Sequence, residues 1–311
     1  MLCLCGLDPL IMEKPLVVCN QAQSSSLPNA ARFGLFDERF YSNYPAGIDS
    51  LTLLLGTRPG FVLWFMQIDD PFPTAKVSGN SALGIKTVIS MNIRSLKIEQ
   101  GRNDTLLGEI AAGLWDKTLS GFAILAASVS APVYLRFGYE MNGGWFSWGK
   151  QPAAFVAAWN RARGIFKLAG ATNVMWIFAP GVLSGTMSFE HDISPYYPGD
   201  SAVDIAGLDG YNFGDFTDKW NWRHRWQSFR MVFERSLVAV TSFGKPVWIT
   251  ETGCPSDPRR PEWLRELFLF MDNNPCIETM LWFNGHKAEE PDFRIESDSA
   301  SVRVFREWLQ M

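Results

Sequence analysis

The segment Pro132-Val-Tyr-Leu-Arg-Phe-Gly-Tyr-Glu140 is a run of apolar and aromatic residues that ends on a carboxylate. A second segment, Pro246-Val-Trp-Ile-Thr-Glu251, has the same form. Apolar runs without strict alternation are typical of strands that are buried on both faces of a parallel sheet. Both segments therefore predict buried strands that carry a glutamate at their C-terminal ends.

Six further segments of this kind are spread along the 311 residues of the chain. Each is rich in β-branched, aromatic or aliphatic residues and ends near Gly, Pro, Asn or Asp, which is the pattern of a short strand. Together with the first two they give eight predicted strands: Arg32–Phe36, Phe61–Gln67, Gly84–Asn92, Pro132–Glu140, Val174–Ala179, Asp204–Tyr211, Pro246–Glu251 and Thr279–Asn284.

Stretches with apolar residues at helical spacing lie between these strands. The clearest are Asp104–Lys117, Pro152–Leu168, Arg225–Thr241, Pro261–Asp272 and Ser299–Leu309. Strands that alternate with helices favour parallel βα units, and a (β/α)8 barrel typically needs about 250 residues. We therefore predict an α/β fold, a single-domain (β/α)8 (TIM) barrel over residues 30–311, preceded by an N-terminal tail or extension at residues 1–29. A doubly wound open sheet is the rival fold, but no G-x-G-x-x-G motif follows the first predicted strand.

Composition and charge exclude several function classes. The net charge is −4 and no run of Lys and Arg is present, so neither nucleic acid nor an anionic membrane is expected as a partner. Cys and His form no cluster with metal-ligand spacing, so we predict neither a metal site nor a cofactor, and we expect a monomer. The odd number of cysteines leaves at least one unpaired within the chain: Cys3, Cys5, Cys19, Cys254 and Cys276.

The N-terminus does not have the pattern of a secretory signal. No basic residue precedes Lys14, and Asp8 and Pro9 interrupt the apolar stretch. No segment predicts a transmembrane helix.

Glu140 and Glu251 end predicted strands four and seven. Their separation, 251 − 140 = 111 residues, corresponds to three βα units of about 37 residues each. Because active sites of such barrels lie at the C-terminal ends of the strands, both carboxylates are expected at the same mouth. Cleavage of a glycoside needs such a pair, one protonated to donate to the leaving oxygen and one ionised to attack or to activate water. The structural alternative for Glu140 is an ion pair with Arg136.

The motifs around these glutamates resemble glycoside hydrolase family 26, the β-mannanase and lichenase family of the clan A barrels. The order and spacing match over residues 130–311, and the first third of the chain matches weakly. The motifs are Leu135-Arg-Phe-Gly-Tyr-Glu-Met-Asn-Gly-Gly-Trp-Phe-Ser-Trp-Gly149, Val203-Asp-Ile-Ala-Gly-Leu-Asp-Gly-Tyr-Asn212, Lys245-Pro-Val-Trp-Ile-Thr-Glu-Thr-Gly253 and Met280-Leu-Trp-Phe-Asn284.

The resemblance implies a retaining, double-displacement glycoside hydrolase. Glu140 would be the general acid/base and Glu251 the nucleophile, with carboxyl groups about 5–5.5 Å apart. Tyr211 would donate its hydroxyl to Glu251, the alternative being a buried core tyrosine. Asp209 is expected only to cap the turn after the sixth strand.

Substrate contacts are also implied by the resemblance. Arg136 and Asn142 would orient Glu140 and the sugar hydroxyls, and Trp145 and Trp282 would offer ring faces to sugars. The remaining candidates are Trp148, which could instead pack within its loop, and Trp64, at a distal subsite or in the core.

The family usually has His immediately before its acid/base, whereas this chain has Tyr139, a further candidate contact. The resemblance therefore leaves the polymer open. It implies an endo-β-glycanase that hydrolyses β-1,4 linkages in β-mannan or mixed-linkage β-glucan and that is secreted or extracytoplasmic. The alternatives are a hydrolase of another β-linked exopolysaccharide and a non-catalytic carbohydrate-binding barrel.

Overall fold

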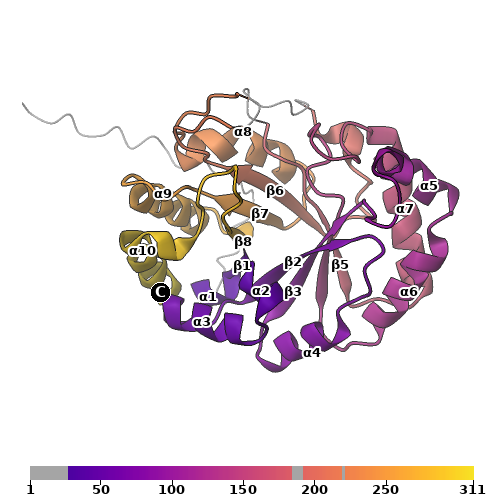
Figure 1. Ribbon diagram of the computed structural model, residues 1–311, viewed down its shortest axis with the longest axis horizontal. Helices are drawn as coiled ribbons and strands as arrows, with labels where there is room; N and C mark the ends of the chain where they lie inside the picture. Colours follow the sequence, from indigo (N-terminus) through magenta and orange to yellow (C-terminus); the bar gives the residue numbers. More distant parts are fainter. Residues whose placement is uncertain (1–26, 184–191, 219–220) are drawn as a thin grey trace, which may run out of the picture.

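The computed structural model describes residues 27–183, 192–218 and 221–311. Its centre is a closed barrel of eight parallel strands in chain order, surrounded by helices (Figure 1). This confirms the predicted (β/α)8 barrel. The strands are β1 (Phe33–Asp37), β2 (Phe61–Gln67), β3 (Lys86–Asn92), β4 (Val133–Phe137), β5 (Val174–Phe178), β6 (Ile205–Tyr211), β7 (Val247–Gly253) and β8 (Ile277–Asn284).

The helices cover the outside of the barrel and bury the outward-facing side chains of the strands. The α-helices are α1 (Asn29–Arg32), α2 (Arg39–Ser42), α3 (Ala46–Leu55), α4 (Thr74–Ala82), α5 (Leu106–Ala112), α6 (Asp116–Ala127), α7 (Pro152–Leu168), α8 (Phe229–Thr241), α9 (Arg260–Asn273) and α10 (Ser299–Leu309). Three short 3-10 helices lie in the connections: η1 (Gln100–Thr105), η2 (Ser194–Tyr196) and η3 (Ile295–Ser297).

The two ends of the described chain meet beside the barrel. The side-chain amide of Asn29 donates a hydrogen bond to the carbonyl of Trp308 at 3.0 Å, which ties α1 to α10. The structured part therefore includes Asn29. The tail predicted for residues 1–29 lies almost wholly outside the described residues.

Two predicted helices differ from the structure. Asp104–Lys117 is wrong as one helix, because Gly113 adopts a left-handed conformation (φ 89°) that ends α5 before α6 begins at Asp116. The helix predicted to begin at Arg225 begins instead at Phe229, where the side chain of Ser228 accepts a hydrogen bond from the Met231 N–H.

The fourth strand is also shorter than predicted. It ends at Phe137, because Gly138 and Glu140 both have positive φ, at 63° and 50°. Glu140 therefore stands on the loop after β4, whereas Glu251 lies within β7. This difference decides how each carboxylate is held.

Cys254 is a free, buried thiol. Among the described residues, no group of His, Cys, Asp and Glu has the arrangement of a metal site. No single described helix is long and apolar enough to cross a membrane; one sharply bent pair, Gly101–Ala112 with Asp116–Ala127, meets the length and composition test only when its halves are combined.

Candidate active site

The loop after β4 is folded back on itself around Glu140. The Glu140 N–H donates to the carbonyl of Ala179 at the end of β5, and the Glu140 carbonyl accepts from Gly143. Farther along, the Lys150 N–H returns to the carbonyl of Met141 at 2.8 Å. A non-glycine residue with positive φ is uncommon and is often found at functional sites. Here these backbone bonds hold Glu140 in that conformation.

The side chain of Glu140 receives one hydrogen bond from its own loop. The indole N–H of Trp145 donates to Glu140 Oε2 at 2.6 Å. Burial, followed by the charge of Glu251, raises the pKa of Glu140 to about 7 against the opposing effect of this indole hydrogen bond. A carboxyl group with such a pKa can donate and accept a proton near neutral pH.

Glu251 is held by the barrel wall and not by a loop. Arg136, from β4, donates from Nη1 to Glu251 Oε2 at 2.9 Å. The hydroxyl of Tyr211, at the end of β6, donates to Glu251 Oε1. Burial and then the charge of Glu251 raise the pKa of Tyr211 well above its usual value, so its proton stays available for this bond. The contact predicted between Tyr211 and Glu251 is present.

Arg136 is the fully buried centre of this network. It donates to Ser90 on β3 at 2.7 Å and forms an ion pair with Asp209 on β6. Burial alone would lower the pKa of Arg136, but the charges of Asp209 and Glu251 outweigh it and raise the pKa. The structural alternative for Glu140, an ion pair with Arg136, is not formed, because the guanidinium faces the carboxylates of β6 and β7.

Asp209 was missed as part of this network. The expectation that it caps a turn is wrong: its carboxylate lies inside the barrel, where it also accepts a hydrogen bond from Thr250 on β7 at 2.7 Å. The signal in the sequence was its position two residues before Tyr211, since residues i and i+2 of a strand lie on the same face.

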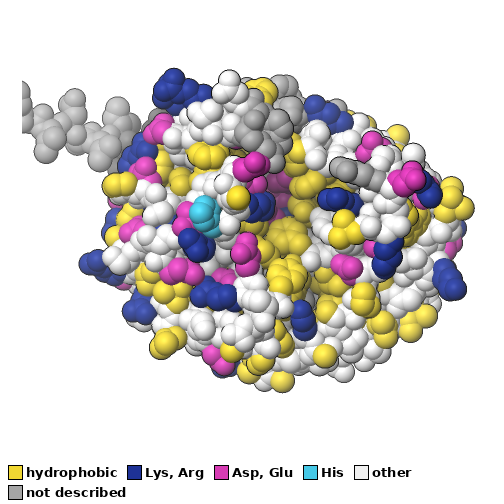
Figure 2. Space-filling model, in the orientation of Figure 1, with side chains coloured by type: hydrophobic (Ala, Val, Ile, Leu, Met, Phe, Trp, Pro, Cys, Tyr) yellow, Lys and Arg dark blue, Asp and Glu magenta, His cyan; other side chains and the backbone are white. Residues whose placement is uncertain are grey.

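The two glutamates are close enough for the charge of one to raise the pKa of the other. The pKa of Tyr139 is raised first by burial and then by the charges of both Glu251 and Glu140. Figure 2 shows a hollow near the middle of the molecule, with acidic side chains inside it and hydrophobic side chains beside them. A sugar bound in this hollow would contact carboxylates and apolar side chains at the same time.

Tyr139 and Asn142 flank Glu140 in the sequence and differ in their partners. Tyr139 is buried and donates its hydroxyl to Asn92 Oδ1, at the end of β3, at 2.8 Å. The guanidinium of Arg136 lies over its ring, 4.8 Å from the centroid. Asn142 exchanges two hydrogen bonds with the backbone of Gly181. Its predicted role in orienting Glu140 is therefore at most indirect, through the loop after β5.

The structure contradicts direct sugar contacts for two of the predicted tryptophans. Trp282 is fully buried on the outer side of β8, where it packs against Trp263 and Phe305 of the covering helices and donates to the Phe293 carbonyl. Trp148 is also buried; it donates to the Tyr139 carbonyl and is stacked on a neighbouring ring of its loop. Trp145 is the exposed member of the predicted set, at 36%.

Trp64 lies in the middle of β2 rather than at its end. Its ring packs against Phe40, Tyr41 and Tyr44, which belong to the layer outside the barrel. It therefore does not reach the carboxylates.

An aromatic cluster beside the site was missed. Phe36 of β1 stacks on Phe283 of β8 with ring centroids 4.8 Å apart, and Phe65 of β2 contacts both Phe36 and Tyr139. Phe283 is the residue next to Trp282. Side chains alternate across a strand. Trp282, which was predicted at the site, therefore faces the helices, and its neighbour Phe283 faces the site.

Comparison with known proteins agrees with these motifs. The model of glycosyl hydrolase family 26 matches residues 108–245. The chain is 31% identical over 212 residues to endoglucanase H of Acetivibrio thermocellus, an alignment that covers 64% of this chain and 22% of that protein. It is 29% identical over 152 residues to a mannan endo-1,4-beta-mannosidase of Bacillus subtilis, covering 45% of this chain and 37% of that protein. The chain thus spans well under half the length of these curated relatives.

Solved structures support the fold. A family 26 beta-mannanase from Bacteroides ovatus superposes with a TM-score of 0.68 at 20% identity, over 89% of this chain and 87% of that one. A Cellulomonas fimi endo-beta-1,4-mannanase double mutant has a TM-score of 0.68 at 18% identity, over 96% of this chain and 76% of that one. The family model matches residues 108–245, and together with the relatives and the barrel it supports membership of glycosyl hydrolase family 26.

Proposed function

We propose that this chain is a retaining endo-β-glycanase that hydrolyses β-1,4 linkages of a polysaccharide by double displacement. The observation that carries the proposal is the unequal surroundings of two neighbouring carboxyl groups. Glu140 has a pKa of about 7, whereas Glu251 accepts hydrogen bonds from Arg136 and Tyr211. Carboxyl groups in such different surroundings suit an acid and a nucleophile.

In the first step, the protonated carboxyl of Glu140 donates its proton to the glycosidic oxygen. The carboxylate of Glu251 attacks the anomeric carbon at the same time, the bond from that carbon to the leaving oxygen breaks, and a glycosyl ester of Glu251 forms. Arg136 and Tyr211 fix the orientation of Glu251 before the attack.

In the second step, Glu140 acts as a base. Formation of the ester removes the negative charge of Glu251, which is one cause of the raised pKa of Glu140. The pKa of Glu140 therefore falls in the intermediate, and the ionised carboxylate takes a proton from water. That water attacks the anomeric carbon, releases Glu251 and gives a product with the original β configuration.

We infer two candidate polymers. β-Mannan follows from the relatives and structures that are named mannanases. Mixed-linkage β-glucan is favoured by two other observations: Tyr139 stands where the family usually has His, and the relative with 31% identity is named an endoglucanase. A monomer acting on a polysaccharide is part of this proposal.

Product sizing on β-mannan, lichenan and laminarin tests the function. We expect internal cleavage of one β-1,4-containing polymer by the wild type and loss of cleavage in Glu251→Ala. Binding of sugar without cleavage of any polymer would instead support the carbohydrate-binding barrel.

Azide tests the assignment of roles. Glu140→Ala keeps the nucleophile, so added azide should replace water in the second step and give the β-azide. Glu251→Ala should give the α-azide, because azide then attacks directly from the opposite face. The reverse pattern would show that the two roles are exchanged.

A further inference from the structure

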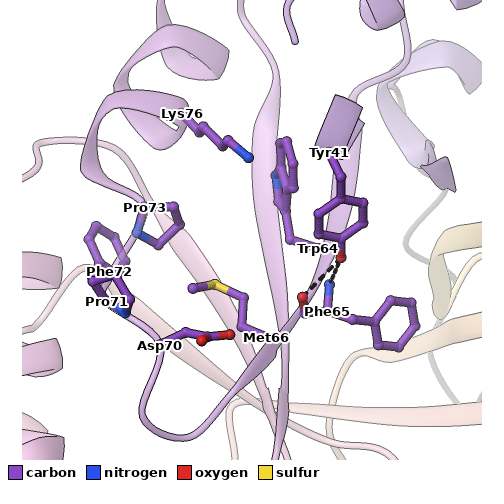
Figure 3. A pocket seen from close by; sticks show the side chains of 9 residues that line it. All are labelled: Tyr41, Trp64, Phe65, Met66, Asp70, Pro71, Phe72, Pro73 and Lys76. Carbon is purple, nitrogen blue, oxygen red and sulfur yellow. Dashed lines mark hydrogen bonds between the residues drawn. The ribbon is translucent and has the colours of Figure 1, made fainter. Parts of the chain in front are cut away.

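A pocket of about 310 Å³ lies on the outer side of β2, between this strand, α2 and α4. Trp64 and Tyr41 form one side and Pro71, Phe72 and Pro73 form the other, with Met66 between them (Figure 3). The volume is at the lower end of the roughly 300–1,000 Å³ of pockets that bind small molecules. It suits one ring and not a chain of sugars.

One wall of the pocket carries a polar group that the protein leaves unsatisfied. Trp64 is only 2% exposed, and its indole N–H has no hydrogen-bond acceptor among the described residues. Figure 3 shows the indole nitrogen on the side of the ring that faces the pocket. A buried donor without an acceptor costs about 1–3 kcal/mol. A ligand hydroxyl would accept this hydrogen bond after a small movement of the side chains that cover the nitrogen, whose accessible area is below 1 Å².

Two charged groups complete the rim. The ammonium group of Lys76 lies over the Trp64 ring, 4.2 Å from the centroid, with no carboxylate within ion-pair distance in the described part of the chain. Asp70 accepts the Gln67 N–H with Oδ2 at 2.7 Å, which leaves its other oxygen for a ligand. One cation and one anion make the lining neutral overall, so it favours a neutral ligand with both donors and acceptors.

Tyr41 supplies a rigid, accessible ring. Its hydroxyl donates to the Phe65 carbonyl at 2.9 Å and accepts the Phe65 N–H at 2.6 Å, so the side chain is anchored to β2 at its tip. The residue is nevertheless 48% exposed. An anchored ring offers apolar contact area with little loss of side-chain entropy on binding.

We propose that this pocket is a second carbohydrate site, which binds one neutral hexose unit of the polysaccharide outside the catalytic cleft. A hexose combines apolar C–H faces, which suit Tyr41 and Phe72, with hydroxyls that suit the Trp64 N–H, Lys76 and Asp70. The inference rests on the proposed function, because it takes its ligand from the same polymer.

The pocket and the cleft lie on opposite faces of β2. Trp64 points to the outer layer, whereas the next residue, Phe65, contacts Tyr139 of the active-site loop at a centroid distance of 5.6 Å. A polymer bound at both places would be retained between cleavage events. The second site is therefore expected to matter for long substrates and not for short ones.

Indole N–H signals test binding directly. In ¹⁵N-labelled Glu251→Gln protein, the signal of Trp64 is assigned from its absence in Trp64→Phe, and that of Trp145 from Trp145→Phe. Titration with mannohexaose and with a mixed-linkage glucan hexasaccharide should shift both signals, each with its own saturation curve. A shift of Trp145 alone would overturn the second site. A shift of neither signal with both sugars would count against the proposed function itself.

Kinetics provide the second arm. Tyr41→Ala and Lys76→Leu should raise KM for the polymer about threefold to tenfold, the effect of one lost aromatic or cation contact. The kcat/KM for a tetrasaccharide should stay unchanged. Lys86→Leu is the matched control, because Lys86 also lies over a ring, that of Phe61, but outside this pocket. An unchanged KM for the polymer in both pocket variants would overturn the proposal, even if the wild type hydrolyses the polymer.

Discussion

Glu140 and Glu251 sit at the same mouth but are built into the protein in different ways. Glu251 lies within a strand, and its partners Arg136 and Tyr211 come from two other strands of the barrel. Glu140 stands on a loop with positive φ, and its side-chain partner, Trp145, belongs to that same loop. The barrel strands fix the position of the Glu251 carboxylate. Burial and the charge of Glu251 set the pKa of Glu140 on its loop.

The largest expected effect is the fall in kcat when the Glu251 carboxylate is removed. Glu251→Gln keeps the size of the side chain but removes the nucleophile, so kcat should fall by about 10⁴-fold or more. Single-turnover measurements on the preferred polymer check this. Residual activity within tenfold of wild type would break the assignment of the strand-held carboxylate as nucleophile.

Arg136 is expected to be the main stabilising element on the side of Glu251. Arg136→Met leaves Asp209 and Glu251 buried without their cation, so the free energy of unfolding should fall by about 3–5 kcal/mol in urea titrations. Arg163→Met is the matched control. Its ion pair with Asp204 is about a quarter exposed, and the loss should be clearly smaller. Equal losses in the two variants would show that the buried network contributes no more to stability than the partly exposed ion pair.

Tyr211→Phe removes a single donor from Glu251. A hydrogen bond to a charged group contributes about 1.5–3 kcal/mol, so kcat/KM should fall roughly 10- to 100-fold while the fold is retained. Tyr197→Phe serves as the control, since that hydroxyl bonds the exposed Asp200. An unchanged kcat/KM in Tyr211→Phe would mean that Arg136 alone positions the nucleophile.

The smallest expected effect is on the loop side. Glu140 must be protonated to act as an acid, so kcat/KM should decline as the pH rises through about 7. The Trp145 hydrogen bond lowers the pKa of Glu140. Trp145→Phe should therefore move this alkaline limb upward, by roughly half a pH unit. A downward shift would contradict the sign of the interaction.

The sequence predicts where the strands and the two glutamates lie along the chain, but not how every side chain is directed. Strand positions and the spacing of Glu140 and Glu251 follow from apolar runs, and the structure confirms the barrel that they predict. The direction of side chains does not follow, because strands buried on both faces show no alternation. For this reason the sequence predicted Trp282 at the site, whereas the structure has Phe283 there.

The ion-pair partners of side chains inside the barrel could not be predicted from the sequence either. Arg136 has carboxylates available from several strands, and only the closed barrel shows that it faces Asp209 and Glu251 and not Glu140. The loop conformation of Glu140 also depends on tertiary contacts, since its N–H is held by Ala179 of another βα unit.

Burial and the charge of the neighbouring Glu251 together raise the pKa of Glu140 and make it an acid. Titration of selectively ¹³C-labelled glutamate carboxyls by NMR, in the wild type and in Glu251→Gln, tests this claim most directly. We predict a pKa of about 7 for Glu140 in the wild type and a lower pKa in the variant, because one cause of the increase is then removed. The same pKa in both proteins, or an ordinary pKa in the wild type, would contradict the account.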